Sequence, residues 1–258
     1  MKIAVCSFEV TGDIKKNVSK IMDMAGNAKS MKADLAVFPE CALTGYPPRD
    51  LNCAKDVSIK EIHEGISRLQ CFSEENGIAI LTGTIWHGEN GTRNRACLFR
   101  PDKQNEIYDK RALWGWDRDN FSEGTEKGIF QFGNIRLGIR ICYEIRFPEY
   151  FRELYLEKTD ADIILFYDVS DSENRDRYEL IRGHIRTRAV ENVTTMICVN
   201  TCGGYPTAPT GIYDRSGRVI KETEPGKEAI LIADIEPKED DFGERGRREI
   251  SDRLLTKR

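Results

Sequence analysis

The sequence predicts an α/β fold with mixed β-sheets, on three observations. Short apolar stretches with a two-residue period alternate with amphipathic stretches of helical period. Some of the apolar stretches are joined by very short turns, which indicates hairpins beside the strand–helix units. The 258 residues are 40% hydrophobic and 32% charged, a composition typical of ordinary globular proteins. We therefore expect a single domain covering residues 1–258.

The N-terminal third begins with a strand, a helix and a second strand. Ile3–Phe8 has the pattern of a strand, and Asp13 is a favourable N-cap for the helix that follows. Residues 35–38 form a short apolar strand that ends at Pro39, as expected of a strand covered on both faces. Gly and Pro between residues 44 and 50 predict a loop, and isoleucines and leucine between 59 and 69 mark the buried face of a second helix.

Several further elements follow from the same patterns. We expect strands over residues 78–85, 96–99, 106–108, 129–132, 135–141, 163–167, 196–200, 211–213 and 229–235, and helices over 148–158 and about 175–192. Gly133-Asn134 predicts a two-residue hairpin turn. Residues 111–128 lack a clear period and predict a structured loop, and the charged residues from about 243 predict a surface tail.

Charge and composition exclude several classes of function. A net charge of −4 and a pI near 5.6 argue against a nucleic-acid partner. No apolar run approaches the ~20 residues of a membrane span, and the N-terminal stretch has no secretory-signal pattern, so we expect a cytoplasmic protein. The eight cysteines form no Cys-x-x-Cys pair and the three histidines are isolated, which predicts reduced thiols and no metal site.

Three chemically reactive side chains stand where predicted strands end. Cys142 lies where a strand turns towards a helix, a place that can stabilise a thiolate and an oxyanion. Glu40 and Lys110 also follow directly on predicted strands. Ligands of open α/β sheets collect at the carboxyl ends of strands, so an acid, a cation and a nucleophile can converge there. Each residue alone has an ordinary structural explanation, as a surface charge or a core cysteine.

Five or more segments in order resemble the nitrilase superfamily, the carbon-nitrogen hydrolases. The resemblance spans nearly the whole chain and is carried by Phe38-Pro39-Glu40, Tyr108-Asp109-Lys110-Arg111, Cys142 to Glu149, Arg188 to Asn192, Cys198-Val199-Asn200 and the Tyr213 to Val219 turn. It implies a four-layer αββα sandwich with two mixed β-sheets. It also implies a homodimer formed through helices, and hydrolysis of non-peptide carbon–nitrogen bonds without a cofactor.

The reactive residues fit that chemistry. A free thiol is mostly protonated near neutrality, so Cys142 needs a base, and Glu40 can take its proton and pass it to the departing amine. Lys110 and the backbone N–H of Tyr143 can stabilise the oxyanion. The result is a thioester on Cys142 that water then releases.

A fourth polar group is expected between Lys110 and Cys142. The family has a second glutamate there, four residues before a phenylalanine and a glycine turn, and Asp117 holds that place here. The carboxylate of Asp117 should hydrogen-bond near Lys110 or Glu40, with Glu123 as the competing candidate. An aspartate keeps the charge on a side chain one methylene shorter.

The residues that contact the substrate are less clearly marked. Tyr46 and Trp114 are candidates for lining the pocket, although aromatic residues are more often part of a core. Arg146 can bind a substrate carboxylate or pair with Glu144 or Glu149, and the structural pairing is favoured. Pocket shape depends on loops over residues 41–56, 86–95 and 112–126.

The sequence favours an amidase-type hydrolase acting on a small amide or carbamoyl compound. Nitrile hydrolysis would use the same residues. The stretch from Leu43 to Leu51 resembles a loop of the glutaminase domains of NAD synthetases, so ammonia supply to a partner is a second alternative. A catalytically idle binding module is an alternative of another class, disfavoured by the intact Glu, Lys and Cys.

Overall fold

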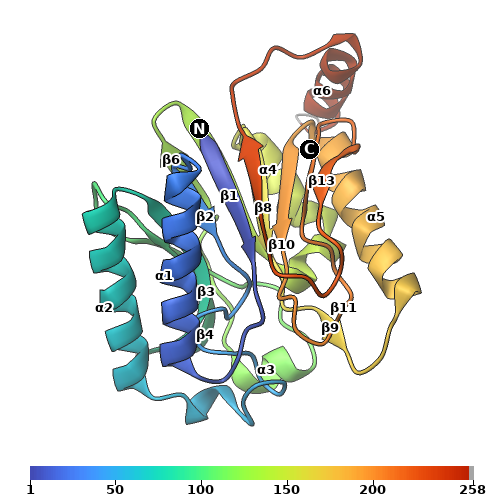
Figure 1. Cartoon of the computed structure of the whole chain (residues 1–258). Helices are drawn as coiled ribbons and strands as arrows, with labels where there is room; N and C mark the ends of the chain where they lie inside the picture. Colours follow the sequence, from blue (N-terminus) through green and yellow to red (C-terminus); the bar gives the residue numbers. More distant parts are fainter. Residues whose placement is uncertain (256–258) are drawn as a thin grey trace.

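Two six-stranded β-sheets pack face to face between two layers of helices (Figure 1). This arrangement is seen in a computed structural model, in which residues 1–255 are described. The predicted four-layer αββα sandwich with two mixed sheets is confirmed.

The first sheet has the strand order β14-β1-β2-β3-β4-β5. Its strands are β1 (Lys2–Ser7), β2 (Leu35–Val37), β3 (Ala79–Gly88), β4 (Gly91–Phe99), β5 (Glu106–Asp109) and β14 (Ala229–Asp234). Strands β1, β2 and β3 are parallel, and β4 is antiparallel to both β3 and β5. The carboxyl ends of β2 and β5 therefore lie at the same edge of this sheet.

The second sheet has the order β13-β12-β10-β8-β7-β6. Its strands are β6 (Ile129–Phe132), β7 (Ile135–Ile141), β8 (Ala161–Leu165), β10 (Thr195–Val199), β12 (Gly211–Tyr213) and β13 (Val219–Glu222). The central strands β7, β8 and β10 are parallel. A small additional sheet pairs β9 (Val169–Ser170) with β11 (Tyr205–Pro206).

The helices lie outside the two β-sheets. They are α1 (Ile14–Ser30), α2 (Ile59–Asn76), α3 (Trp116–Asn120), α4 (Pro148–Leu156), α5 (Arg175–Asn192) and α6 (Phe242–Leu255), with 3-10 turns η1 (Ala54–Asp56) and η2 (Cys142–Arg146). Helices α1 and α2 pack on the first sheet, and α4 and α5 pack on the second. The expected N-cap is present, because an Asp13 carboxylate oxygen accepts from the backbone N–H of Lys16 at 3.1 Å.

The core is divided as a four-layer sandwich requires. The apolar faces of the two sheets meet in a central layer that includes Val5, Leu81 and Ile139. Separate apolar layers lie between each sheet and its helices. No helix in the described part of the chain has the length and apolar content needed to cross a membrane.

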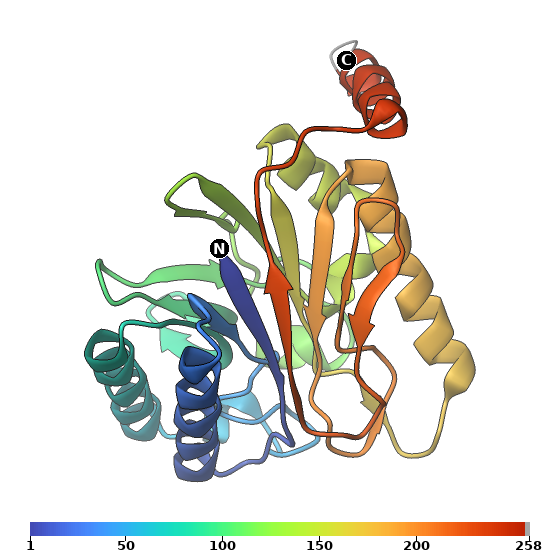
Figure 2. The same cartoon turned by 45° about the horizontal axis from the view of Figure 1, so that its top comes forward.

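Three segments differ from their predictions. The loop expected over residues 111–128 contains the short helix α3, and β4 begins at Gly91 rather than at residue 96. The residues from about 243, expected as a charged surface tail, form helix α6, which stands at one end of the sandwich in Figure 2. This helix is attached through hydrogen bonds, since the Tyr155 hydroxyl donates to the Asp252 carboxylate at 2.7 Å.

Candidate active site

Glu40 lies at the end of β2 and is completely buried. Its Oε1 accepts hydrogen bonds from Asn94 Nδ2 at 2.7 Å and from Lys110 Nζ at 2.8 Å. Its Oε2 accepts from the backbone N–H of Tyr167 at 2.8 Å. Burial raises the pKa of Glu40, and the charge of Lys110 opposes this shift. The carboxyl group is thus held in one position with an increased proton affinity.

The segment that carries Glu40 lies directly against β3, and this approach requires a glycine there. A Cβ atom added at Gly83 would lie 2.2 Å from the backbone nitrogen of Cys41 and 2.6 Å from Cα of Glu40. No larger residue fits without moving the backbone of Glu40.

Lys110 follows β5 and is the centre of the buried charge cluster. Its Nζ donates to Glu40 Oε1 at 2.8 Å and to Asp117 Oδ2 at 2.7 Å, and the side chain is only 1% exposed. Burial alone would lower the pKa of Lys110, but the charges of Asp117 and Glu40 outweigh burial and raise it well above its ordinary value. Lys110 therefore stays a cation.

Cys142 is the first residue of η2, at the end of β7. Its φ angle of 46° is in the left-handed region, which is uncommon for a residue other than glycine and often marks a functional site. Burial raises the pKa of the Cys142 thiol well above its ordinary value, the charge of Glu40 adds to this shift, and the charge of Lys110 opposes it. The resting sulfur is accordingly a thiol that needs a base, and Glu40 and Lys110 lie close enough to act on it electrostatically.

Asp117 lies on α3 and is bound to two candidate site residues. Its Oδ2 accepts from Lys110 at 2.7 Å and its Oδ1 accepts from the Tyr46 hydroxyl at 2.7 Å. The Tyr46 ring stacks on the Tyr167 ring with centroids 5.1 Å apart. The hydrogen bond expected between Asp117 and Lys110 is present. The side chain of Glu123 is exposed, so the competing candidate lies outside this cluster.

The remaining predicted contact residues do not join the charged cluster. Trp114 is 63% exposed and lies under the guanidinium of Arg118, whose carbon is 4.9 Å from the ring centroid. Tyr143, next to Cys142, is half-buried and packs edge-on against Phe147 with centroids 5.2 Å apart.

The contacts of Arg146 differ from the predicted pairing with Glu144 or Glu149. Within residues 1–255 it makes no ion pair with Glu144 or Glu149, because the Glu144 carboxylate is occupied by other donors. The half-buried guanidinium instead lies near His184, whose pKa is lowered by burial and by the charges of Arg188 and Arg146. The predicted pairing of Arg146 with a neighbouring glutamate is wrong.

Two site residues were missed in the sequence. Asn94 on β4 donates to Glu40 and accepts the backbone N–H of Lys110 on its own carbonyl at 2.9 Å. Asp168 raises the pKa of Cys142 and binds the guanidinium of Arg177 through both carboxylate oxygens, at 2.9 and 3.0 Å. No local signal marks Asn94, because its neighbours Arg93 and Arg95 are charged and its burial follows from the pairing of β4 with β3.

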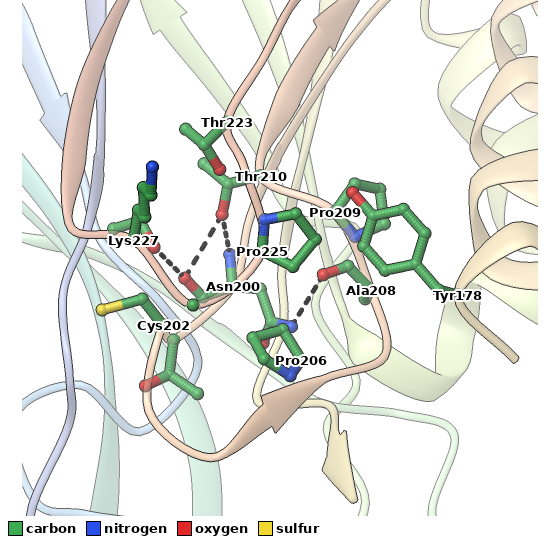
Figure 3. A pocket seen from close by; sticks show the side chains of 13 residues that line it. Tyr178, Asn200, Cys202, Pro206, Ala208, Pro209, Thr210, Thr223, Pro225 and Lys227 are labelled. Atoms are coloured by element: carbon green, nitrogen blue, oxygen red, sulfur yellow. Dashed lines mark hydrogen bonds between the residues drawn. The ribbon is translucent and has the colours of Figure 1, made fainter. Parts of the chain in front are cut away.

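The side chain of Asn200 forms hydrogen bonds to the backbone of Asp168. Its Nδ2 donates to the carbonyls of Asp168 and Ala208, both at 2.9 Å, and its Oδ1 accepts from the N–H of Asp168 at 2.9 Å. Figure 3 shows Asn200 in a small pocket with Thr210, whose hydroxyl accepts a hydrogen bond from the Asn200 backbone N–H at 2.9 Å.

Within residues 1–255, no group of three or more His, Cys, Asp or Glu residues is arranged to hold a metal ion.

Comparison with known proteins identifies the family. The sequence profile of the carbon-nitrogen hydrolases matches residues 2–239. The chain is 27% identical over 238 residues to the glutamine-dependent NAD(+) synthetase of Thermotoga maritima, covering 87% of this chain and 40% of the synthetase. It is 26% identical over 247 residues to the 2-oxoglutaramate amidase of Bacillus subtilis, covering 92% and 91% of the two chains. The chain thus spans less than half the length of the NAD(+) synthetases that it matches.

Solved structures share the fold. A variant of the amidase from Nesterenkonia sp. AN1, with acrylamide added at its active-site cysteine, superposes with a TM-score of 0.81 at 22% identity, covering 99% of this chain and 100% of that one. A second variant, in complex with butyramide, has a TM-score of 0.80 at 22% identity over 91% of this chain and 90% of that one. With the profile match over nearly all of its length, this chain belongs to the carbon-nitrogen hydrolase family of the nitrilase superfamily.

Proposed function

We propose that this protein is an amidase that hydrolyses a small amide or carbamoyl compound through a thioester on Cys142. The observation that carries the proposal is the buried cluster in which Lys110 bonds to Glu40 and Asp117, with Cys142 within the field of these charges. The cluster holds a base, a cation and a nucleophile at one place, as acyl transfer requires. No cofactor enters the proposed steps.

In the first half of the reaction, Glu40 takes the proton of the Cys142 thiol while the sulfur attacks the amide carbonyl carbon. Because burial raises the pKa of Glu40, its carboxylate is a stronger base than an exposed glutamate. Lys110 and the backbone N–H of Tyr143 stabilise the oxyanion of the tetrahedral intermediate, where loss of one donor typically costs about 10² to 10³ in rate. The carbon–nitrogen bond then breaks, and Glu40 returns its proton to the departing amine or ammonia.

In the second half, water releases the acyl group. Glu40, again a carboxylate, takes a proton from the attacking water, and the same donors stabilise the second tetrahedral intermediate. The carbon–sulfur bond breaks, the sulfur recovers a proton from Glu40, and the carboxylic or carbamic acid leaves. The high pKa of the Cys142 thiol means that a thiol, not a free thiolate, is restored between turnovers.

Three other functions differ in the substrate that they use or in having no turnover. Nitrile hydrolysis would begin with the same attack on a nitrile carbon. The similarity to glutamine-dependent NAD(+) synthetases favours glutaminase-type ammonia supply to a partner as a second candidate. A catalytically idle binding module would leave Cys142 unreactive.

A substrate screen separates these functions. Small amides, ω-amides, carbamoyl compounds, glutamine and nitriles are incubated with the protein and with Cys142→Ala, and ammonia release is measured. We expect release from an amide or carbamoyl class, absent in Cys142→Ala. Release from glutamine that rises with an added partner protein indicates the ammonia-supply function, and a nitrile converted faster than its matched amide indicates a nitrilase. No release, together with a Cys142 that resists electrophiles, indicates a binding module.

We also propose a homodimer formed through helices, located in the cytoplasm. Leu156 on α4 and Leu254 on α6 are 57% and 62% exposed and line one groove, so an apolar surface is available for a second copy. All eight cysteines are free thiols, as is usual in a reducing compartment.

A further inference from the structure

Glu144 is a fully buried carboxylate, two residues after Cys142, that bonds to both catalytic segments. Its Oε1 accepts from the backbone N–H of Arg111 at 2.8 Å and from the Tyr108 hydroxyl at 2.7 Å. Its Oε2 accepts from the backbone N–H of Ile141 at 2.7 Å. One side chain therefore joins the residue after Lys110 to the residue before Cys142.

We propose that Glu144 is a positioning residue that sets the distance between Lys110 and the sulfur of Cys142. This inference rests on the proposed function, because it assigns a role within the same reaction. Lys110 follows β5 of the first sheet, and Cys142 follows β7 of the second sheet. No strand pairing joins β5 to β7. Packing between sheets allows small sliding movements, whereas hydrogen bonds from one carboxylate to both backbones fix their separation.

The bond to Ile141 also supports the unusual backbone of Cys142. A non-glycine residue with φ of 46° is strained, and such strain persists only where surrounding contacts fix it. The chain runs from Ile141 through Cys142 to Glu144, whose carboxylate returns to the Ile141 N–H and closes a tight loop around the nucleophile. Removing that acceptor allows the loop to relax and turns the sulfur away from its base.

A second set of contacts, made through side chains, also connects the segment after Lys110 to β7. The Arg111 guanidinium bonds to Glu153 on α4, and Glu153 Oε2 accepts from Arg140 Nη2 at 2.9 Å. Arg140 is fully buried on β7, the strand that ends just before Cys142. The segment after Lys110 is thus attached to β7 twice, through Glu144 and through Glu153.

The chemistry of the contacts predicts what glutamine does at this position. All three partners of Glu144 are donors, whereas a glutamine offers one oxygen and an NH₂ group that is itself a donor. In either orientation the NH₂ group faces a backbone N–H, that of Arg111 or that of Ile141. Glu144→Gln therefore keeps the shape but releases one catalytic segment. Glu144→Asp keeps the charge but is one methylene shorter and cannot reach both segments.

The test compares Glu144→Gln and Glu144→Asp with Asp162→Asn. Asp162 is a matched control, a carboxylate 1% exposed on β8 whose Oδ1 accepts from Thr159 at 2.7 Å and which lies outside the charge cluster. For each variant kcat and KM are measured on the best amide of the screen, together with thermal unfolding. The rate of alkylation of Cys142 by iodoacetamide is read by peptide mass spectrometry, because Cys71 is exposed and Cys53 and Cys202 are half-buried like Cys142.

Both Glu144 variants are expected to lose about tenfold or more in kcat, on the scale of misplaced catalytic groups, with KM little changed and slower alkylation of Cys142. Asp162→Asn should keep the wild-type kcat and alkylation rate. A folded Glu144 variant with wild-type kcat overturns the proposal, and so does a loss of activity that only follows the loss of folded protein. If neither variant folds, Glu144 serves folding and the proposal is also wrong. Activity in Cys142→Ala would instead refute the proposed function.

Discussion

Replacing Asp117 by asparagine changes the charge next to Lys110 with almost no change in shape. Asp117 Oδ2 accepts from Lys110 Nζ at 2.7 Å, and its Oδ1 accepts from the Tyr46 hydroxyl at 2.7 Å. Both side chains of the ion pair are at most 5% exposed, so solvent screens the interaction little. An asparagine can still accept one hydrogen bond from the Lys110 ammonium through its uncharged amide oxygen, but it leaves Lys110 with Glu40 as its single anionic partner.

The loss in rate follows from that bond. A hydrogen bond to a charged group contributes about 1.5–3 kcal/mol, and each 1.4 kcal/mol corresponds to about tenfold in rate. If the bond serves to orient Lys110 towards the oxyanion, Asp117→Asn should lower kcat by about tenfold to a hundredfold. The pH profile should move as well. The charge of Asp117 raises the pKa of Glu40, so its removal should shift the acid limb of kcat/KM to lower pH.

The assay is steady-state hydrolysis of the best amide over a range of pH, with two comparison variants. Asp117→Glu keeps the charge and should be milder. Glu123→Gln removes an exposed carboxylate from the same loop and should run at the wild-type rate. Wild-type kcat in Asp117→Asn would refute the role given to Asp117, and a crippled Glu123→Gln beside it would assign that role to Glu123.

Three further predictions concern pH, stability and assembly. Because burial raises the pKa of Glu40 above its ordinary 4.5 and the base must be deprotonated, activity should fall with decreasing pH through a pKa above 4.5, and an acid limb below that value would contradict the assignment. Burial raises the pKa of Asp162 from 3.8 to about 6, so this group's contribution to stability is present below pH 3.8 and lost as the pH rises through about 6. Chemical denaturation should accordingly show Asp162→Asn gaining up to about 3 kcal/mol relative to wild type between pH 4 and pH 8, and an unchanged difference would refute this. Light scattering should show a dimer for the wild-type protein and a monomer for the double variant Leu156→Glu/Leu254→Glu. A monomeric wild type would rule the dimer out.

The three residues of the proposed catalytic trio could be picked out in the sequence because each stands at the end of a predicted apolar strand. Lys110 and Cys142 directly follow β5 and β7, and Glu40 follows β2 after Phe38 and Pro39. The carboxyl ends of β2 and β5 lie at one edge of the first sheet, whereas β7 belongs to the second sheet. Asp117 could be found from its spacing to Phe121 and Gly124. The hydrogen bonds of Asp117 depend on the conformation of residues 111–128, including α3, and this segment has no periodic pattern in the sequence.

Other parts of the site depend on long-range contacts that a local pattern does not contain. Asn94 falls within the loop expected over residues 86–95, yet pairing along the whole length of β3 extends β4 back to Gly91. Arg146 has two acidic neighbours in sequence, but Glu144 is taken by backbone donors from another segment. Helix α6 could not be predicted from the sequence because half of its 14 residues are charged and its attachment uses hydrogen bonds such as that from Tyr155.

Intact-protein mass spectrometry during turnover tests the central claim most directly. The protein is mixed with the best amide from the screen, quenched in acid after a fraction of a turnover and weighed, and the modified peptide is sequenced. The mechanism predicts a mass increase equal to the substrate's acyl group, located on Cys142, and neither adduct nor ammonia in Cys142→Ala. Full ammonia release by Cys142→Ala, or an acyl group carried on another residue, would contradict the mechanism.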